Sequence, residues 1–374
     1  MKKILIYGLT KNHGGIESFI YNHLKAMDKS GLELHFLVYE APVFYDEIKE
    51  MGGVFHFVKR RGEDLKENRQ KTKELFEQYD FDTIWFNVCT LSYIYPLKCA
   101  FEAGVPNRIV HVHSPNASGG WKMKLAHNFN KMIFKKYTNV YLSCSEGATE
   151  YSFDRNIVEN RDYKIIYNAI DIEKFKFNEK SREEIRQELQ LNDEFVVGHV
   201  GRFSDVKNHD FLLDVFNEIT KLDDSARLVL VGGGEKEEEI RNKIDLLNLN
   251  EKVKILGVRN DAHKILSAMD AYVFPSKYEG LSLSMVEAQV SGLICFTSTN
   301  ISEENKVIDQ VYFYDLSDSP KNWAKKILDK SKDYPRKDFT QIIGDKGFDI
   351  NKNVKELKKI LLWKENFRMQ KIKD

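Results

Sequence analysis

Two carboxylates eight positions apart stand out in the second half of the chain. Glu279 and Glu287 flank Gly280, and they follow an apolar run, Ala271–Phe274, that is typical of a β-strand. The segment after the glycine has the pattern of a helix, so free backbone N–H groups and the positive end of a helix dipole should lie between the carboxylates. A phosphate at the helix end, with sugar hydroxyls on the carboxylates, is what a nucleotide-sugar pocket requires.

Each carboxylate also has a purely structural explanation. Ser284 and Glu287 fit a capping box, in which the glutamate only satisfies backbone donors. Glu279 could be an ordinary loop acid. The binding interpretation is favoured because groups suited to the same ligand follow other strands of the chain.

A basic loop is the next such group. Arg202 and Lys207 lie between a strand, Phe195–Val200, and a helix. Arginine can make paired contacts to a diphosphate, lysine adds a point charge, and the helix end adds partial positive charge. The alternative is an ordinary loop with Asp205 or Asn208 as the helix N-cap.

Glycine-rich turns follow three further strands. Gly14 and Gly15 precede Glu17 directly after the first strand, where paired glycines allow a ligand to approach the backbone. Gly233 is the centre of a triple glycine, and Arg259 belongs to the loop 257–261. Each turn could also be a structural strand–helix connection, with Glu17 only favouring the helix N-terminus.

A histidine pair ends another strand. His111 and His113 are two residues apart, so both imidazoles should share one face of the strand. A zinc site is disfavoured because no further ligand stands at a suitable spacing. A core histidine bonded to the backbone is the main alternative for each.

In this order the motifs resemble those of the retaining GT-B glycosyltransferases of family 4, over almost the whole chain. Glu279 and Glu287 match the E-x7-E motif, His113 with Ser114 matches the histidine beside the donor sugar, and Arg202 with Lys207 matches the diphosphate loop. The resemblance implies an α/β chain of two Rossmann-like domains, whose parallel sheets face each other across a cleft. It places an acceptor domain at 1–170 and a nucleotide-sugar domain at 171–354, with a final helix at about 355–374 returning to the first domain.

The resemblance further implies transfer of a hexose or N-acetylhexosamine from a UDP-sugar to a hydroxyl of a lipid-linked glycan, with retention of configuration and without a metal. The implied catalytic residues are His113, Arg202, Lys207 and Glu279. The implied donor-binding residues are Gly14, Gly15, Gly201, Arg202, Lys207, Gly233, Arg259, Glu279, Gly280, Leu281 and Glu287.

Two departures from the family pattern narrow the subgroup. Ser282 stands where the family often has proline, and the section 297–304 lacks the usual glycine-rich loop. The first departure bears on the selection of the sugar, and the second favours the subgroup that builds bacterial capsular polysaccharide or exopolysaccharide. A nucleotide-sugar-binding protein without turnover and a nucleotide-sugar 2-epimerase remain as alternatives.

Composition limits the remaining possibilities. The chain has 374 residues, enough for two domains, and its 57 basic and 57 acidic residues give no net charge that would favour nucleic acid. The four cysteines are scattered without metal-binding spacing. No apolar run is long enough to be a signal peptide or to cross a bilayer, so we expect a cytoplasmic protein, peripheral to the membrane at most.

Strands alternate with helices, which is typical of doubly wound parallel sheets. The predicted strands are 3–7, 33–39, 54–58, 83–87, 108–112, 140–143, 164–166, 195–200, 227–231, 252–256, 271–274 and 294–297. The predicted helices are 15–30, 66–79, 91–103, 122–137, 146–152, 208–222, 236–247, 262–268, 283–290, 322–330 and 352–373.

The segment 121–137 has a second pattern. Trp121, Leu125, Phe129 and Ile133 recur every four residues, and five lysines flank them. A basic amphipathic helix can lie on an anionic membrane surface. The same apolar stripe can equally pack on a core, and the sequence leaves both alternatives open.

Overall fold

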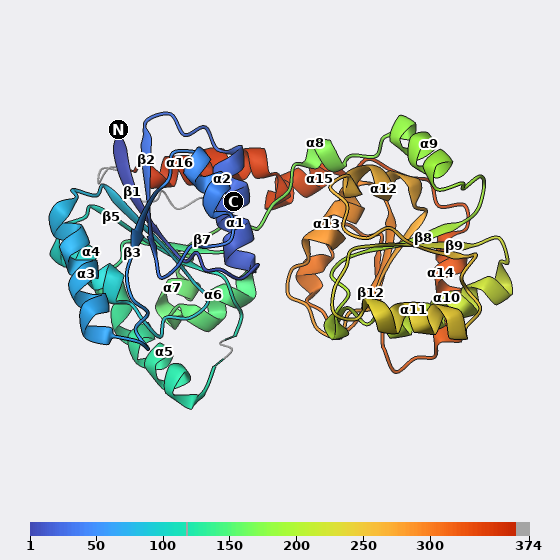
Figure 1. Ribbon diagram of the computed structural model, residues 1–374, viewed down its shortest axis with the longest axis horizontal. Coiled ribbons are helices and arrows are strands. Elements are labelled where there is room, and N and C mark those ends of the chain that lie inside the picture. The colour runs from blue at the N-terminus through green and yellow to red at the C-terminus, as the bar shows by residue number, and fades with distance from the viewer. Residues whose placement is uncertain (117–118, 364–374) are drawn as a thin grey trace. The chain divides into compact units, whose positions relative to one another are not determined.

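The computed structural model describes residues 1–116 and 119–363 (Figure 1). The chain divides into two compact units. The first holds residues 1–169 and the segment that begins at Ile350, and the second holds Ile170–Asp349. The sequence had placed these boundaries after residues 170 and 354. Ile170 donates its N–H to the Phe348 carbonyl at 3.1 Å. The first and the last but one residue of the second unit are therefore hydrogen-bonded to each other.

The described part of the first unit contains a parallel sheet of order β3-β2-β1-β4-β5-β6-β7. Its strands are β1 Lys2–Tyr7, β2 Leu32–Val38, β3 Val54–Phe57, β4 Thr83–Val88, β5 Asn107–Val112, β6 Val140–Ser143 and β7 Lys164–Ile165. Its helices are α1 Gly15–Ala26, α2 Tyr45–Glu50, α3 Leu65–Gln78, α4 Tyr95–Glu102, α5 Trp121–Ile133, α6 Glu146–Ser152, α7 Arg155–Glu159 and α16 Ile350–Leu361.

Two apolar cores cover the faces of this first sheet. Helices α1 and α16 pack on one face, and α3, α4 and α6 pack on the other. The side chain of Thr83 donates to the Leu361 carbonyl at 2.8 Å, which joins the end of α16 to the first residue of β4. The predicted final helix is thus present from Ile350 to Leu361, and its continuation over 364–374 lies outside the described residues.

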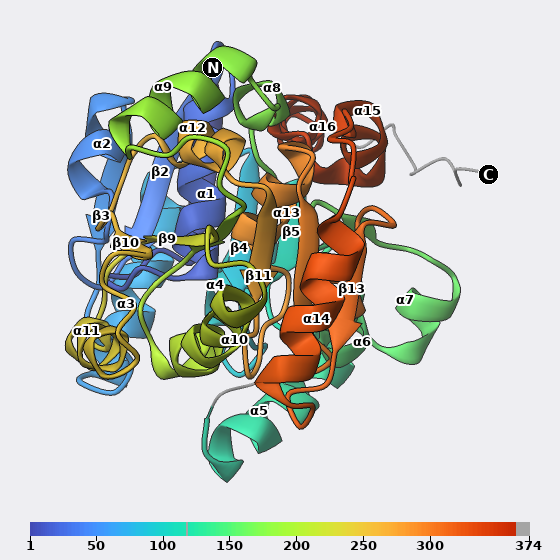
Figure 2. The ribbon, with the colours of Figure 1, turned by 90° about the vertical axis from the view of Figure 1, so that its right-hand side faces the viewer.

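The second unit repeats this plan with a parallel sheet of order β10-β9-β8-β11-β12-β13. Its strands are β8 Val196–Val200, β9 Arg227–Val231, β10 Val253–Ile255, β11 Ala271–Phe274, β12 Ile294–Ser298 and β13 Val311–Tyr314. Its helices are α8 Ile172–Phe175, α9 Glu179–Glu188, α10 His209–Leu222, α11 Glu237–Leu246, α12 Ala262–Ala268, α13 Leu283–Val290, α14 Pro320–Ser331 and α15 Thr340–Ile343. Helices α10 and α14 pack side by side (Figure 2).

The predicted α/β class with two Rossmann-like sheets is confirmed. All the predicted strands are present, but the edge strand β13 was missed because its run of four residues has no clear helical segment before it. The helix α9 was also missed, because its sequence is strongly polar and only Ile185 and Arg186 are buried. The short helices α2, α7, α8 and α15, of four to six residues, were missed as well. None of these elements changes the position of the strand ends that carry the predicted motifs.

Candidate active site

The sheet of the second unit reverses its strand order between β8 and β11. Ligands of open parallel sheets bind outside the carboxyl ends of the strands at such a reversal. Two loops meet at this point. Lys277 donates its N–H to the Val206 carbonyl at 2.8 Å, and the Asn208 side chain donates to the Pro275 carbonyl at 3.1 Å. The predicted motifs after β8 and β11 therefore form one continuous surface.

An ion pair between Lys207 and Glu279 joins the two loops. Lys207 Nζ lies 2.5 Å from Glu279 Oε2, and the side chains are 16% and 25% exposed. The same Nζ lies 4.4 Å from the centre of the Phe274 ring. A lysine and a carboxylate in direct contact can bind a phosphate and an adjacent hydroxyl of one ligand. The structure thus brings together two residues that lie in separate sequence motifs.

The loop that carries Glu279 is held by a buried asparagine. Asn305, at the end of a 3₁₀ turn, donates its Nδ2 to the Gly280 carbonyl at 2.5 Å. Its Oδ1 accepts the N–H of Ser282 at 2.8 Å. Leu281 lies between these two anchored residues, and α13 begins at Leu283. Asn305 therefore fixes the backbone of Gly280 and Leu281 just before the helix N-terminus.

Glu287 lies one turn inside α13. The N-cap position is Ser282, which makes no side-chain capping bond, so the capping-box explanation of Glu287 is wrong. Within the part of the chain that the structure describes, the Glu287 carboxylate accepts no hydrogen bond. Burial raises the pKa of Glu287 to about 7, and Lys174 on α8 opposes this shift. A half-buried carboxyl without a partner costs free energy, which makes it a candidate to bind ligand hydroxyls.

The glycine loops after β8, β9 and β10 pack directly on one another. Phe203 donates its N–H to the Gly233 carbonyl at 3.0 Å, and Gly232 donates to the Gly257 carbonyl at 2.8 Å. Gly232 has a φ of +143°, and a Cβ there would lie 1.9 Å from the Gly201 carbonyl oxygen. Only glycine allows these loops to approach so closely.

The two predicted donor-binding arginines are engaged elsewhere. Arg202 Nη2 lies 3.0 Å from Glu235 Oε2, and the Arg202 side chain is 73% exposed. Arg259 pairs with Asp261 and Glu188 at 2.7 and 2.8 Å. Among the residues with described positions, no ion pair joins either arginine to Glu279. Arg202 would have to leave Glu235 in order to contact a ligand beside Lys207.

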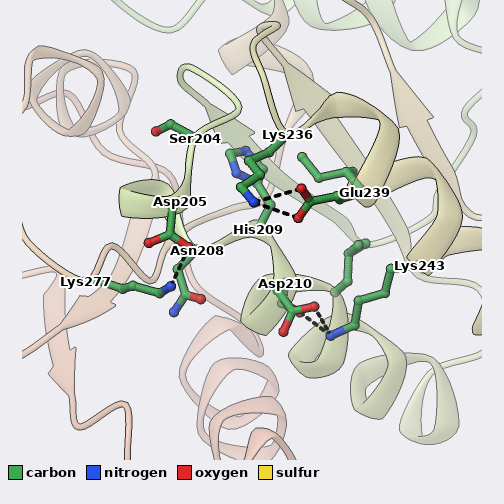
Figure 3. A pocket seen from close by; sticks show the side chains of 11 residues that line it. Ser204, Asp205, Asn208, His209, Asp210, Lys236, Glu239, Lys243 and Lys277 are labelled. Atoms are coloured by element: carbon green, nitrogen blue, oxygen red, sulfur yellow. Dashed lines mark hydrogen bonds and ion pairs between the residues drawn. The ribbon is translucent and has the colours of Figure 1, made fainter.

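A small cavity of about 70 Å³ lies beside this surface, at the first turn of α10 (Figure 3). Each of its lysines has a carboxylate partner: Lys236 with Glu239, Lys243 with Asp210, and Lys277 with Asp205. Because its charges are balanced, the cavity has little attraction for a diphosphate. Neither Lys207 nor Glu279 lines it.

The corresponding strand ends of the first unit carry the glycine loop. Glu17 is 6% exposed and accepts hydrogen bonds from the backbone and the hydroxyl of Thr10, at 3.1 and 2.5 Å. A Cβ on Gly14 would lie 2.6 Å from the Glu17 carboxylate, whereas a Cβ on Gly15 would meet nothing within 4 Å. Glu17 therefore shapes the loop through side-chain bonds, and the open side of Gly15 is accessible to a ligand.

His111 and His113 do share one face, with ring centres 4.2 Å apart. His111 is fully buried, so the core explanation holds for it. His113 is only half-buried, and its Nε2 lies 3.0 Å from Asn87 Oδ1. Because the Asn87 Nδ2 donates to the Trp85 carbonyl, its Oδ1 accepts, and His113 Nε2 is the donor. Burial lowers the pKa of His113 to about 3, which keeps the ring neutral, and within the described part of the chain its Nδ1 is an acceptor without a hydrogen bond.

Comparisons with known proteins agree with this geometry. The model of glycosyltransferase family 4 matches residues 13–174, and that of glycosyl transferases group 1 matches residues 181–343. The putative glycosyltransferase EpsF of Bacillus subtilis is 30% identical over 363 residues, which are 94% of each chain. The chain belongs to the family 4 glycosyltransferases of the GT-B fold.

Other relatives of this glycosyltransferase are similar over different lengths. The capsular polysaccharide biosynthesis glycosyltransferase CapH of Staphylococcus aureus is 27% identical and covers 97% of this chain and 99% of its own. An Escherichia coli UDP-Gal:α-D-GlcNAc-diphosphoundecaprenol α-1,3-galactosyltransferase is 30% identical over 55% of this chain and 54% of its own. The crystal structure of Anabaena HepE in complex with UDP has a TM-score of 0.78, with 18% identity, and covers 97% of this chain and all of its own.

Two residues that support this glycosyltransferase site were missed in the sequence. Asn305 directly follows the section 297–304, which was noted only for lacking glycines, and Asn87 is the last but one residue of β4, within an apolar run. A buried asparagine in such a run is a signal, because a buried amide must find hydrogen-bond partners. The partners themselves lie 23 and 26 positions away and could not be identified from local pattern.

The described residues of this glycosyltransferase offer neither a metal-binding cluster nor a membrane-spanning helix. No cluster of three histidine, cysteine, aspartate or glutamate side chains in that part of the chain could hold a metal ion. No helix there is long and apolar enough to cross a membrane.

Proposed function

We propose that this glycosyltransferase moves a hexose or N-acetylhexosamine from a UDP-sugar to a hydroxyl of a polyprenyl-diphosphate-linked glycan. The proposed reaction retains the anomeric configuration, needs no metal and takes place at the cytoplasmic face of the membrane, in capsular polysaccharide or exopolysaccharide synthesis. The observation that carries the proposal is the contact between Lys207 and Glu279 at the strand-order reversal of the second sheet.

The contact suits the junction between a diphosphate and a sugar. In the proposal, Lys207 binds the departing diphosphate and Glu279 binds hydroxyls of the donor sugar, so the bond that breaks lies between them. The N–H groups of Gly280 and Leu281, fixed by Asn305, support the phosphate from the helix side. Such fixed donors stabilise the charge that develops on the leaving group and can replace a metal ion.

The remaining predicted residues have matching roles. Glu287, whose carboxyl has no partner among the described residues, binds the ribose hydroxyls. Arg202 exchanges Glu235 for the diphosphate, and the loops of Gly201, Gly233 and Arg259 receive the nucleotide. In the first unit, Gly14 and Gly15 leave the backbone open, and the neutral His113 accepts a hydrogen bond from the donor sugar.

The relatives support the donor and acceptor classes. The name of the Escherichia coli enzyme gives a UDP-sugar as donor and a diphosphoundecaprenol-linked sugar as acceptor. HepE was crystallised with UDP. CapH belongs by name to capsular polysaccharide biosynthesis. These are properties of the relatives, and we extend them to this chain as part of the proposal.

The direct test is a panel of UDP-sugars and other nucleotide sugars, first in thermal shift and then in turnover. Binding to the folded protein raises its melting temperature, and the true donor should raise it the most. Release of UDP, with transfer to a prenyl-diphosphate sugar and an α-linked product by NMR, is the expected outcome. Binding without turnover would identify a nucleotide-sugar-binding protein, and an epimerised donor without transfer would identify a 2-epimerase.

The variants Lys207→Ala and Glu279→Gln should abolish most of this turnover. Lys221→Ala is a matched control, because Lys221 also pairs with a glutamate, Glu218, but at the far end of α10. Equal loss of activity in the control and in Lys207→Ala would contradict the assigned site.

A further inference from the structure

The helix α5 presents its apolar side chains to solvent. Trp121, Leu125, Phe129 and Met132 are 71%, 63%, 57% and 65% exposed, although they lie along one face of the helix. Ile133, predicted to continue this stripe, instead packs against the core of the first unit. A helix on the surface of a globular protein normally turns such a stripe inward. We call Trp121, Leu125, Phe129 and Met132 the outer stripe.

Polar side chains hold the opposite face of α5 to the protein. The ring of His127 is 1% exposed, and its Nδ1 accepts the N–H of Leu91 at 3.1 Å. Asn130 donates to the Leu91 carbonyl at 2.7 Å, and Lys131 donates to the Tyr151 carbonyl at 2.6 Å. These bonds fix the rotation of the helix about its axis, so the outer stripe cannot turn inward without breaking them.

The charge around the outer stripe has one sign. The segment 119–137 contains five lysines and no aspartate or glutamate. Lys131 and Lys135 are engaged, the latter with Asp154 at 3.0 Å. Among the described residues, Lys122, Lys124 and Lys136 have no carboxylate partner. The face therefore combines an apolar stripe with uncompensated positive charge.

A cavity of about 420 Å³ opens at the first turn of α5. Its lining includes Lys122 from α5 and Arg61 from the loop after β3. The Arg61 guanidinium lies 5.3 Å from the centre of the Tyr93 ring and has no carboxylate partner within the described chain. The cavity adds a second basic group beside the outer stripe, at the same end of the helix as Trp121.

We propose that the outer stripe of α5 docks the protein on an anionic lipid bilayer, with the stripe in the interface and Lys122, Lys124, Lys136 and Arg61 at the phosphate groups. Charge complementarity selects this occupant. A second copy of this chain, whose net charge is zero, brings no overall charge opposite to that of the basic rim. An anionic bilayer offers an apolar interface and negative charge together. The inference rests on the proposed function only in that a lipid-linked acceptor gives the docking a purpose.

The test is co-sedimentation of the full chain with vesicles, without donor or acceptor. We expect the protein to sediment with phosphatidylcholine vesicles that contain phosphatidylglycerol, at low salt. It should stay in the supernatant with pure phosphatidylcholine, and high salt should release it because exposed charges are screened. Fluorescence of Trp121 should shift to the blue on binding, and Trp121→Phe should lose this shift.

Two variants separate the apolar and charged contributions. Lys122→Gln/Lys124→Gln/Lys136→Gln should weaken vesicle binding about 10–100-fold, since each lysine near the surface contributes to attraction. Trp121→Ser/Leu125→Ser should also weaken it. The matched controls are Lys66→Gln/Lys71→Gln/Lys73→Gln on α3 and Leu222→Ser/Leu246→Ser in the second unit, whose side chains are also exposed. Both controls should bind as the unchanged protein does.

Three results would overturn the proposal. The unchanged protein could stay in the supernatant at low salt, or the controls could lose as much binding as the α5 variants. A dimer in solution that Trp121→Ser/Leu125→Ser dissociates, without vesicle binding, would assign the stripe to contact between copies. Turnover of the nucleotide sugar is measured separately, so failure of the docking proposal and failure of the proposed transferase activity are distinguishable.

Discussion

The two units reverse their strand order at equivalent places, between β1 and β4 and between β8 and β11, but the groups at the two reversals differ in charge. In the second unit the loops are joined by the charged pair Lys207–Glu279. In the described part of the first unit the carboxylate of Glu17 bonds only to Thr10 of the loop after β1, and Asn87, near the end of β4, bonds to His113, which burial keeps neutral. The same backbone plan therefore supports two kinds of chemistry.

This difference in charge indicates which unit is suited to hold a charged ligand. A diphosphate needs a cation and fixed N–H donors, which the second unit offers. Neutral acceptors such as the Nδ1 of His113 suit hydroxyl groups, whose binding requires no change of charge. Within the proposed function, the anionic part of the donor therefore belongs to the second unit.

The largest effect should come from removing the cation of the second unit. Lys207→Ala and Arg202→Ala should each lower transfer by roughly 10²–10³-fold, the scale seen when one transition-state donor is lost. Lys207 should be at the upper end, because it already lies at the reversal while Arg202 must leave Glu235. Steady-state kcat/KM measures the loss. Near-normal turnover in both variants would contradict the assignment of the diphosphate to the basic groups of the second unit.

A smaller effect, with opposite signs for binding and stability, is expected for Glu287→Gln. The pKa of Glu287 in the folded protein is about 7, above its ordinary value of 4.5. The folded state therefore binds a proton that the unfolded state has released, and stability falls as pH rises between these values. The glutamine variant should lack this fall and melt higher at pH 8, while UDP binds about 10-fold more weakly through one lost hydrogen bond.

Thermal unfolding from pH 4 to pH 8 and UDP titration measure the two effects. A variant with the same pH slope as the unchanged protein and unaltered UDP affinity would sink the ribose assignment. A loss of melting temperature at every pH would instead indicate a structural role for the carboxylate.

The charge of His113 should be sensitive to a single substitution at its hydrogen-bond partner, Asn87. In the unchanged protein His113 should not titrate between pH 5 and 8, because its pKa is about 3 and burial also lowers the pKa of the neighbouring His23 and His111. Asn87→Asp should raise the pKa of His113 by about 1–3 units, since an adjacent carboxylate favours the charged ring. NMR titration of the imidazole measures the shift, and His113 titrating near pH 6.5 in the unchanged protein would refute its neutral role.

The smallest expected effect is that of chelation. Activity should be unchanged by EDTA, because the proposal assigns the stabilisation of the diphosphate to Lys207, Arg202 and backbone N–H groups. A loss of activity that Mn²⁺ or Mg²⁺ restores would show that protein groups at the second reversal are insufficient without a metal.

Most of the fold could be predicted because buried parallel strands are short apolar runs bounded by glycine loops, a local signal. The sites were predicted only as separate motifs. Nothing local in the sequence reveals that Lys207 contacts Glu279, 72 positions later, or that Arg202 turns to Glu235. Such pairings depend on which loops the sheet order brings together.

The helix α5 shows which property follows from the local sequence and which depends on the tertiary structure. The sequence by itself determined an amphipathic helix with lysines beside an apolar stripe, because a helical period places residues four apart on one face. It did not determine which face points outward. The tertiary structure decided that, through the bonds of His127 and Asn130 to Leu91. An isolated helix has no preferred rotation about its axis. Hydrogen bonds with the distant backbone of Leu91 hold the polar face of α5 against the protein, and the apolar face is therefore left to the solvent.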